Sequence, residues 1–298
     1  MITSVISDQP NGTGRNSLLA CDQISARTYR GLCELIHRRS RIHLGPNRQS
    51  MLTSRLNLRR QGLGLNSWDA YYNHLLHPNN QDELDNLIEL IATNHTQFFR
   101  EISHFERLQA TILDGILSDC PGAESQLSSW SAACSSGEEA YSMAITIHAY
   151  LQKRPGPQPN WIVYASDISR KALTIASKGI YAQSSLHLPK AEWLARYFRR
   201  GNGPYAGQCR IKSLITERVR FKQINLFQDI YPLPQSLQLI FCRNVLIYFA
   251  KDSQEQLVSR LHGMLCRGGY LVVGHSDSLA SLRHDFESLG GGVFRRSN

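Results

Sequence analysis

Apolar runs alternate with segments of helical spacing through the last two thirds of the chain, a pattern typical of α/β proteins. The run 130–134 (WSAAC) predicts a short buried strand. Residues 135–137 (Ser-Ser-Gly) supply a turn, and helical spacing begins at Glu138. Ser136 and Glu139 fit the capping-box pattern of a helix start. We therefore expect a strand, a tight turn and a helix, which together bring the turn to the carboxyl edge of a parallel sheet.

Further apolar runs continue this alternation toward the C-terminus. The β-rich run 161–166 ends at Asp167 and is the second predicted strand. Later strands, the last of them antiparallel near an edge, are expected at 218–221, 237–242, 270–274 and 293–296. Helical spacing covers 105–119, 170–177 and 253–265, and we expect the last of these helices to stop at Gly268 and Gly269.

The alternation lapses between residues 179 and 221. Residues 201–204 (Gly-Asn-Gly-Pro) have the composition of a turn, and 209–212 has the pattern of a small strand. We predict a hairpin-bearing β-subdomain inserted at about 180–221. The alternative is an excursion of the chain with a structural role alone.

The N-terminal third has helical spacing only. One apolar stripe is formed by Leu32, Leu35 and Ile36, and a second one by the aromatic and leucine residues of 68–76. We expect a small all-helical domain at 23–91, a linker at 92–105 and the α/β domain at 106–298. Residues 1–22 are rich in Ser, Asn, Gly and Thr, which predicts a disordered tail.

Composition places the chain among globular proteins, because 42% of its 298 residues are hydrophobic and 19% are charged. Apolar runs stay far below the ~20 residues that cross a bilayer, and the first twenty residues do not resemble a signal peptide. The seven cysteines contain no C-x-x-C pair, and the histidines show no ligand spacing. We expect a cytoplasmic protein with no metal and no membrane insertion, acting as a monomer.

The net charge of +9 is concentrated near the N-terminus. Nine arginines share a window whose only carboxylate is Glu34, namely Arg27, Arg30, Arg38, Arg39, Arg41, Arg48, Arg55, Arg59 and Arg60. In a helix over 49–60, Arg48, Arg55 and Arg59 would share one face. Such a face attracts an acidic partner, and the alternative is a solvated helix surface.

The turn after the first predicted strand indicates the chemistry of the ligand. A phosphate-binding loop needs repeated glycines, whereas here a single glycine precedes Glu138 and Glu139. Carboxylates suit a cationic ligand such as S-adenosylmethionine, and Asp167 at the tip of the second strand suits ribose hydroxyls. The alternatives are that the glutamates complement the helix dipole and that Asp167 caps the next helix.

Four further segments are similar to signatures of the CheR family of chemoreceptor methyltransferases. They run in order along the chain and are ATNHTQFFRE (92–101), DISRKALTIASKGIY (167–181), LIFCRNVLIYF (239–249) and GGYLVVGHS (268–276). The chain departs from the family pattern at Asp277, where the family has Glu. The matches extend from about Ile91 to the C-terminus, and the first and third segments are the most specific.

The resemblance implies a Rossmann-like S-adenosylmethionine-dependent methyltransferase sheet with a small β-subdomain, preceded by the helical domain. It implies methyl transfer to glutamate side chains of chemoreceptors, with S-adenosylhomocysteine as the other product. The basic helical domain would face the acidic methylation helices of the receptor through Arg48, Arg55 and Arg59. In some family members the β-subdomain docks a peptide at the receptor's C-terminus, for which strand addition at an edge is the natural mode.

The resemblance also implies roles for individual residues. Arg100 and Tyr248 would act in catalysis, Arg100 by clamping a carboxylate and Tyr248 by orienting the incoming one. The cofactor would contact Asn94, Thr96, Arg100, Glu138, Asp167, Asn225, Leu226, Arg243 and Asn244. As alternatives, Asn94 and Thr96 could cap a helix, Arg100 could pair with Glu101 or Glu106, and Tyr248 could be an ordinary core residue.

Two other functions are weighed against this one. The arginine-rich segment is compatible with a nucleic-acid methyltransferase. Such enzymes usually carry an Asn/Asp-Pro-Pro-aromatic turn, however, and here the corresponding strand ends in CRNVLIYF. The basic residues also lack interleaved aromatics for stacking, so we expect no nucleic-acid partner. A non-catalytic adaptor that only binds S-adenosylmethionine is the third reading, and Arg100 and Tyr248 argue against it.

Overall fold

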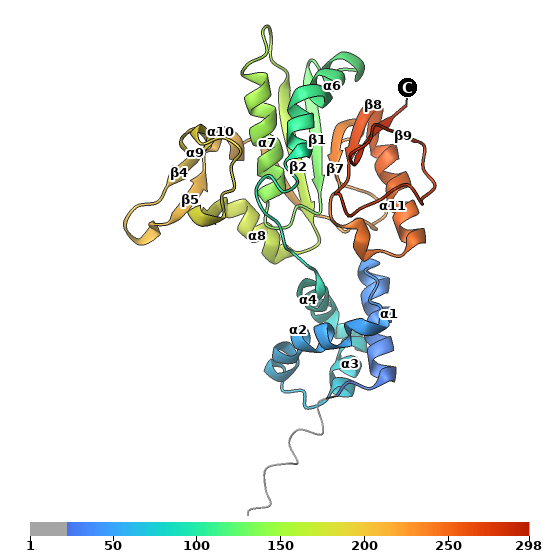
Figure 1. Ribbon diagram of the computed structural model, residues 1–298. Coiled ribbons are helices and arrows are strands. Elements are labelled where there is room, and N and C mark those ends of the chain that lie inside the picture. The colour runs from blue at the N-terminus through green and yellow to red at the C-terminus, as the bar shows by residue number, and fades with distance from the viewer. Residues whose placement is uncertain (1–22, 298) are drawn as a thin grey trace, which may run out of the picture.

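The computed structural model describes residues 23–297 and consists of an α/β unit with a helical unit below it in the view of Figure 1. The helical unit contains α1 (Ala26–Ser40), α2 (Gln49–Gly62), α3 (Trp68–Leu76) and α4 (Gln81–Ile91). Ser25 and Ser67 cap α1 and α3 by accepting hydrogen bonds from backbone amides two or three residues into each helix. The predicted apolar stripes, among them Leu32, Ile36 and Tyr71, meet in a separate core.

Seven strands form the main sheet in the order β6-β2-β1-β7-β8-β10-β9. Their bounds are β1 (Gln126–Ala132), β2 (Asn160–Asp167), β6 (Val219–Gln223), β7 (Leu237–Phe241), β8 (Leu265–Val272), β9 (Phe286–Ser288) and β10 (Val293–Arg296). The first five strands in this order are parallel, and β10 pairs antiparallel with both β8 and β9. Strand order reverses between β1 and β7, and ligands of α/β sheets bind at the carboxyl ends of strands at such a switch point.

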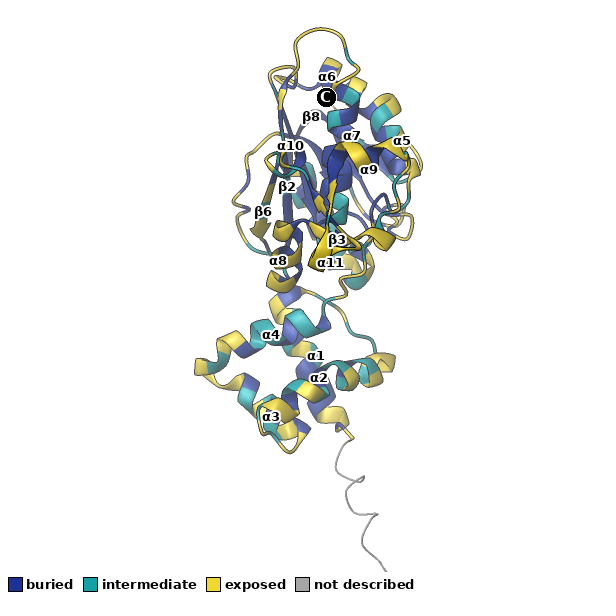
Figure 2. Ribbon diagram, turned by 90° about the vertical axis from the view of Figure 1, so that its left-hand side faces the viewer, coloured by how far each residue is buried: buried dark blue, intermediate teal, exposed yellow. Residues whose placement is uncertain are grey.

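Helices cover both faces of this sheet. Its strands are accordingly largely buried in Figure 2. One face packs against α7 (Glu138–Leu151) and a long helix made of α5 (Ser103–Arg107), a π-helical turn (Leu108–Ile112) and α6 (Leu113–Asp119). The other face packs against α11 (Lys251–Met264), with Trp130, Ile240 and Leu271 in the core between them. The helix α8 (Arg170–Lys178) follows β2. Among helices of the described residues, none is both long enough and apolar enough to cross a membrane.

The predicted insertion is a second, three-stranded antiparallel sheet in the order β3-β5-β4. It consists of β3 (Ile180–Ala182), β4 (Phe198–Arg200) and β5 (Gln208–Ile211), with α9 (Glu192–Tyr197) before β4 and α10 (Ser213–Thr216) after β5. It projects from the side of the molecule in Figure 1. The predicted hairpin is therefore confirmed, and β3 and β4 are the two edges of this sheet.

Two local predictions are wrong. The cap of α7 is Gly137 in the left-handed region, at φ 96°, and the capping box of Ser136 with Glu139 does not form. Gly268 and Gly269 do not end α11, because α11 stops at Met264 and both glycines lie within β8, where the pairing with β7 is irregular. The last strand of the chain, β10, pairs antiparallel next to the edge of the sheet as predicted, and β9 is the edge strand itself. The predicted tail at 1–22 lies outside the described residues.

Candidate active site

A cavity of about 570 Å³ lies between the helical unit and the carboxyl edge of the sheet. Its walls come from the segment between α1 and α2, the linker after α4, the turn after β1, and the ends of β2, β6 and β7. Of the residues predicted for the site, the cavity is lined by Asn94, Thr96, Arg100, Asp167, Asn225, Leu226, Arg243, Asn244 and Tyr248. The fold thus brings together side chains that are up to 154 residues apart in sequence, from Asn94 to Tyr248.

Hydrogen bonds to backbone carbonyls join the two units beside this cavity. Asn225 Nδ2 donates to the carbonyl of Arg39 at 2.7 Å, and the amide of His43 donates to the carbonyl of Tyr248 at 2.8 Å. Ile42 and Phe249 form an isolated antiparallel bridge next to it. The helical unit is therefore a wall of the cavity as well as a separate packing unit.

The linker between α4 and α5 is pinned to the α/β unit while its polar residues face the cavity. Ser135 Oγ donates to the carbonyl of Asn94 at 2.9 Å, and the amide of Phe99 donates to Ser142 Oγ at 3.0 Å. Phe98 and Phe99 are buried in the core of the α/β unit, and Phe99 has φ 53°. Because α5 starts at Ser103, neither Asn94 nor Thr96 caps a helix.

Arg100 keeps its guanidinium at the cavity. Its Nη1 donates to the carbonyl of His95 at 3.0 Å, and within residues 23–297 it forms no ion pair with Glu101, Glu106 or any other carboxylate. The alternative of a local salt bridge is therefore wrong. A half-buried guanidinium with most of its donors free can clamp a carboxylate.

Asp167 is a buried carboxylate at the tip of β2, with an exposed fraction of 5%. Its two oxygens accept from the amides of Ser135 at 2.8 Å and Ser169 at 2.9 Å. Burial raises the pKa of Asp167, and these amide hydrogen bonds oppose the shift. Ser169, not Asp167, caps α8 by accepting from Ala172. Each carboxylate oxygen keeps a free lone pair for hydroxyl donors in the cavity.

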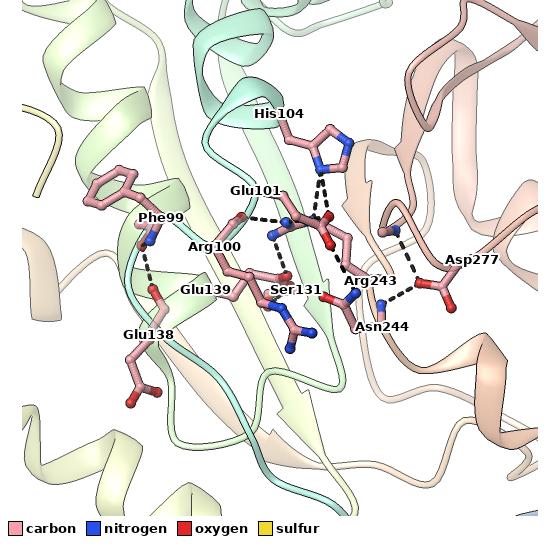
Figure 3. Close-up of polar contacts among 12 residues, drawn as sticks. Phe99, Arg100, Glu101, His104, Ser131, Glu138, Glu139, Arg243, Asn244 and Asp277 are labelled. Atoms are coloured by element: carbon pink, nitrogen blue, oxygen red, sulfur yellow. Dashed lines mark hydrogen bonds and ion pairs between the residues drawn. The ribbon is translucent and has the colours of Figure 1, made fainter. Parts of the chain in front are cut away.

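Of the two adjacent glutamates, Glu139 lines the cavity and Glu138 does not. Glu139 accepts from Ser131 Oγ at 2.7 Å and from Arg243 Nη1 at 3.1 Å. The Glu138 carboxylate accepts from Ser136 Oγ at 2.7 Å and points away from the Arg243 group in Figure 3. Glu139, which the sequence analysis does not single out for the ligand, thus lies on the cavity wall, and the cofactor contact expected of Glu138 stays a prediction.

Arg243 is the centre of the polar network in Figure 3. The residue is 4% exposed, and its guanidinium donates to Glu139, to Glu101 Oε2 at 2.9 Å, to His104 Nδ1 at 3.0 Å and to the carbonyl of Arg100. A buried cation of this kind is tolerable only when its donors are satisfied, which these four acceptors achieve. Burial favours a raised pKa for Glu101, but Asn244, Arg243 and the His275 amide outweigh it and lower that pKa to about 2.

Asn244 has a left-handed backbone, at φ 55°, that turns the chain after β7. Its amide donates to Asp277, and its Nδ2 donates to Glu101 Oε1 at 3.1 Å. Asp277 also accepts from the amides of Gly274 at 3.1 Å and Ile247 at 3.2 Å. The aspartate that replaces the family's glutamate is thus fully engaged with three backbone amides and holds the turn that carries Tyr248.

The residues predicted to contact the adenine and the substrate lie on the remaining walls of the cavity. Asn225 and Leu226 follow β6, and the carbonyl of Leu226 accepts from Tyr231 Oη and Arg260. Tyr248 is half-buried, packs against the core beside Phe249 and also lines the cavity. Its side chain is therefore part of both the core and the cavity wall.

The predicted basic face is less free than the sequence suggests. Arg55 donates to the carbonyls of Ile91 at 2.6 Å and Ala92 at 3.3 Å, and so caps the end of α4. Arg59 forms an ion pair with the buried carboxylate of Glu83. Arg48 is exposed at the rim of the cavity, and its guanidinium has no hydrogen bond or ion pair with the part of the chain that is described.

The cavity residues fit S-adenosylmethionine by their chemistry. Carboxylates at Asp167 and Glu139 suit hydroxyl and ammonium donors, the Arg100 guanidinium suits a carboxylate, and Leu226 with Ile168 supplies apolar wall for a base. Glu101, His104 and His275 place possible metal ligands within 4.8 Å of one another. Their contacts with Arg243, Asn244 and the carbonyl of Gly291 already use the ligand atoms of Glu101 and His104.

Comparisons with known proteins agree with this geometry. Residues 94–294 match the family model described as "CheR methyltransferase, SAM binding domain", and residues 27–92 match "CheR methyltransferase, all-alpha domain". The chain is 36% identical over 274 residues to a chemotaxis protein methyltransferase of Salmonella typhimurium, covering 92% of this chain and 91% of that protein. It is 35% identical to that of Escherichia coli, with 92% of each chain covered. Identity to chemotaxis protein methyltransferase 2 of Pseudomonas aeruginosa is 34%, covering 88% and 90%.

Proposed function

Because the chain belongs to the CheR family of S-adenosylmethionine-dependent chemotaxis methyltransferases, we propose that it methylates glutamate side chains of chemoreceptors. The products would be glutamate methyl esters and S-adenosylhomocysteine. The observation that carries the proposal is the cavity at the switch point of the sheet, where Asp167, Glu139 and Arg100 converge. This charge arrangement suits a donor that contains a cation, a carboxylate and a ribose.

We propose the following contacts for the donor. Asp167 would hold the ribose hydroxyls, and Glu139 would accept from the ammonium in place of Glu138. Asn225 and the Leu226 backbone would contact the adenine. The remaining contacts of the site would come from Asn94, Thr96, Arg100, Arg243 and Asn244. The proposal is supported by their position on the cavity wall, which Glu138 does not share.

The donor supplies an electrophilic methyl group on a sulfonium, and an ionised glutamate attacks it in line without first losing a proton. The chain therefore needs no general base, and its contribution is alignment and exclusion of water. Arg100 would hold a carboxylate, and the Tyr248 hydroxyl would orient the incoming side chain. Both line the same cavity, and the proposal gives both of them roles in catalysis.

The receptor would approach from the side of the helical unit. Arg48 at the rim is free to contact an acidic helix, whereas Arg55 and Arg59 would support that surface through their bonds to α4. The β-subdomain offers β3 and β4 as edges to which a receptor C-terminal peptide could add a strand. We further propose a division into units at 23–91 and 106–298, with a linker at 92–105. We also propose that the protein is a monomer and that it acts in the cytoplasm, where the receptor helices would meet it.

Transfer of a labelled methyl group tests the function. The protein is incubated with methyl-labelled S-adenosylmethionine and either receptor-containing membranes or nucleic acid. We expect label on the receptor that alkali releases as methanol, because glutamate methyl esters are alkali-labile. Alkali-stable label on nucleic acid would contradict the proposal, and so would donor binding without transfer to either acceptor.

Two variants localise the activity to the cavity. Arg100→Ala and Tyr248→Phe should each lower the rate of transfer by roughly 100-fold, the size of effect that loss of a positioning contact produces. Their unfolding free energies should change by less than about 1 kcal/mol, since both side chains are partly exposed. Wild-type rates in both variants would remove these residues from the site.

A further inference from the structure

A buried histidine, His104, does not line the cavity but contacts Arg243, which does. We propose that His104 is a positioning residue for methyl transfer, which acts by fixing Arg243 and through it the backbone of Arg100 and the carboxylate of Glu139. The inference rests on the proposed roles of Arg100 and Glu139. His104 lies in α5, directly after the linker, and its side chain is fully buried.

The contacts of His104 define which ring nitrogen carries the proton. Nε2 lies 3.0 Å from the carbonyl of Gly291, an acceptor only, so Nε2 must be the protonated nitrogen. Nδ1 then carries a lone pair and accepts a hydrogen bond from Arg243 Nε at 3.0 Å. Burial and the positive charge of Arg243 lower the pKa of His104 to about 4, so the ring is neutral near pH 7. The other groups facing it are Glu101, at 3.4 Å, and the ring of His275.

The orientation of Arg243 determines where its other donors point. A guanidinium is planar, so an acceptor at Nε fixes the directions of Nη1 and Nη2. In this orientation Nη1 reaches Glu139, and Nη2 reaches Glu101 and the carbonyl of Arg100. The rings of Phe105 and Phe241, 5.4 and 5.7 Å from the guanidinium carbon, leave it little freedom to shift. Without His104 the Nε–H would be a buried donor without an acceptor, and the group would reorient.

A glycine turn braces His104 from the opposite side. Gly290, Gly291 and Gly292, in the turn before β10, have φ of 74°, 57° and 74°. Val273 donates to the carbonyl of Gly292 at 2.8 Å, and Arg107 of α5 donates to the carbonyls of Leu289 and Gly290. The turn is thus tied both to the sheet and to the helix of His104, which places the Gly291 carbonyl at a fixed point. This chain of contacts runs from the C-terminal strands to the linker that carries Arg100.

Two substitutions test separately the hydrogen bond that the His104 ring accepts and the one that it donates. In His104→Asn the side-chain oxygen can take the place of Nδ1 and accept from Arg243, whereas in His104→Gln the amide can take the place of Nε2 and donate to Gly291. Each variant keeps one of the two bonds, so a role in stability alone would affect both similarly. We expect kcat at saturating donor to fall roughly 10- to 100-fold in His104→Gln and to stay within about threefold of wild type in His104→Asn.

The measurements are kcat and KM for methyl transfer to receptor membranes, with far-UV circular dichroism and a urea titration of each variant. Wild-type kcat in a folded His104→Gln, or equal losses of kcat in both variants, would overturn the inference. A wild-type protein that transfers no methyl group to receptor would contradict the proposed function instead, and would be seen before any variant is compared.

A second measurement reads the protonation of the His104 ring in the wild-type protein. Nitrogen-15 NMR of histidine-labelled wild-type protein should show one ring with a protonated Nε2 and a bare Nδ1 that does not titrate between pH 5 and pH 8. His104→Asn identifies this signal by its loss. A His104 ring with the proton on Nδ1, or one that titrates near its ordinary pKa of about 6.5, would overturn the inference.

Discussion

Two buried carboxylates give the cavity its character at the scale of single residues. Asp167 is held by two backbone amides, and Glu139 is held by a serine and by Arg243. Amide hydrogen bonds and a nearby guanidinium stabilise the ionised forms against the cost of burial. Burial raises the pKa of both carboxyls and these contacts limit the shift, which leaves two acceptors for a cationic, hydroxyl-bearing ligand.

A matched pair of substitutions tests which glutamate serves the ligand. Glu139→Gln should weaken binding of S-adenosylhomocysteine roughly 10- to 100-fold, the loss expected when a charge-assisted hydrogen bond is removed. Glu138→Gln, one residue earlier, should leave the affinity within about twofold of wild type. Isothermal titration calorimetry measures both. The reverse order of the two effects would return the role to Glu138.

The sequence indicates the acidic pair but cannot decide between its members. The choice depends on where α7 begins, because a shift of one residue turns each side chain by about 100° around the helix axis. The expected capping box places the cap at Ser136, whereas the helix starts after Gly137 with φ 96°. Asp167 was easier to predict, since the last residue of a parallel strand always reaches the carboxyl edge of the sheet.

The lowered pKa of His104 makes stability depend on pH with a definite sign. The unfolded chain binds this proton near pH 6.5 and the folded protein only near pH 4, so acidification across that window favours unfolding. Between pH 7 and pH 5 wild type should lose about 2 kcal/mol more unfolding free energy than His104→Asn. Urea titrations at the two pH values measure the difference.

Glu101 provides an internal check on that result. Its folded-state pKa of about 2 lies below its ordinary value of 4.5, so its stabilisation is present above pH 4.5 and is lost as the pH falls toward 2. Its contribution is therefore nearly constant between pH 7 and pH 5. The same loss in wild type and in His104→Asn would show that other groups titrate in this window.

Short segments without regular structure carry much of the site at the scale of elements. The linker holds Arg100, the turn after β7 holds Asn244 and Tyr248, and the turn before β10 supports His104. Each segment is fixed by a left-handed residue and by hydrogen bonds to a neighbouring strand or helix. Such positions cost free energy locally and are maintained by the surrounding contacts.

The glycine turn before β10 offers a test with a control in the same turn. A Cβ at Gly292 would lie 2.6 Å from the carbonyl oxygen of Val273 and 3.1 Å from His104 Nε2, whereas a Cβ at Gly290 meets no atom within 4 Å. Both residues have φ of 74°, so each alanine should cost about 1–2 kcal/mol of backbone strain. Gly292→Ala should cost a further 1–3 kcal/mol or so because of the close approach. Urea titrations giving equal losses would contradict this account.

Elements with strong patterns were predictable, and their ends were not. The apolar runs locate β1, β2 and β7 within a few residues, and the turn composition at 201–204 locates the hairpin of the β-subdomain. The helix stop predicted at Gly268 and Gly269 is wrong because glycines that usually end a helix also permit an irregular strand. Here Gly268 adopts φ 76° inside β8, where the register with β7 shifts.

The two units share the cavity at the scale of the whole molecule. Besides the contacts of Asn225 and His43, Glu89 of α4 accepts from Ser169 Oγ at 2.7 Å and from the amide of Arg170, at the start of α8. A carboxylate at this position complements the free amides and the dipole of the helix. The helical unit is thus anchored to the strand tip that carries Asp167.

Loosening this anchor should weaken the binding of ligands that need both walls. Glu89→Gln removes a charge worth about 1 kcal/mol at a helix start, so affinity for S-adenosylhomocysteine should fall by as much as roughly fivefold. Glu34→Gln is the control, because Glu34 is exposed on α1 and its ion pair with Arg38 is long, at 3.8 Å, and lies within the same helix. Calorimetry that finds the two variants equal in affinity would show that the anchor does not act on the cavity.

Nothing in the sequence alone shows that the helical unit lines the cavity. The basic window indicates a partner surface, but Arg55 and Arg59 bind within the unit. The contacts that join the units combine the side chains of Asn225 and Glu89 with backbone atoms of Arg39, His43 and Tyr248. Backbone contacts between distant segments leave no pattern of residue types. The family resemblance predicted the two units and the fold, whereas their meeting at the cavity needed the structure.

A crystal structure of the protein with S-adenosylhomocysteine tests the central claim most directly. The account predicts the ligand in the cavity between the two units, with its ribose on Asp167, its ammonium on Glu139 and its carboxylate within reach of Arg100, while Glu138 stays outside. Ligand bound elsewhere, or bound in the cavity without contact to Asp167 and Glu139, would contradict it.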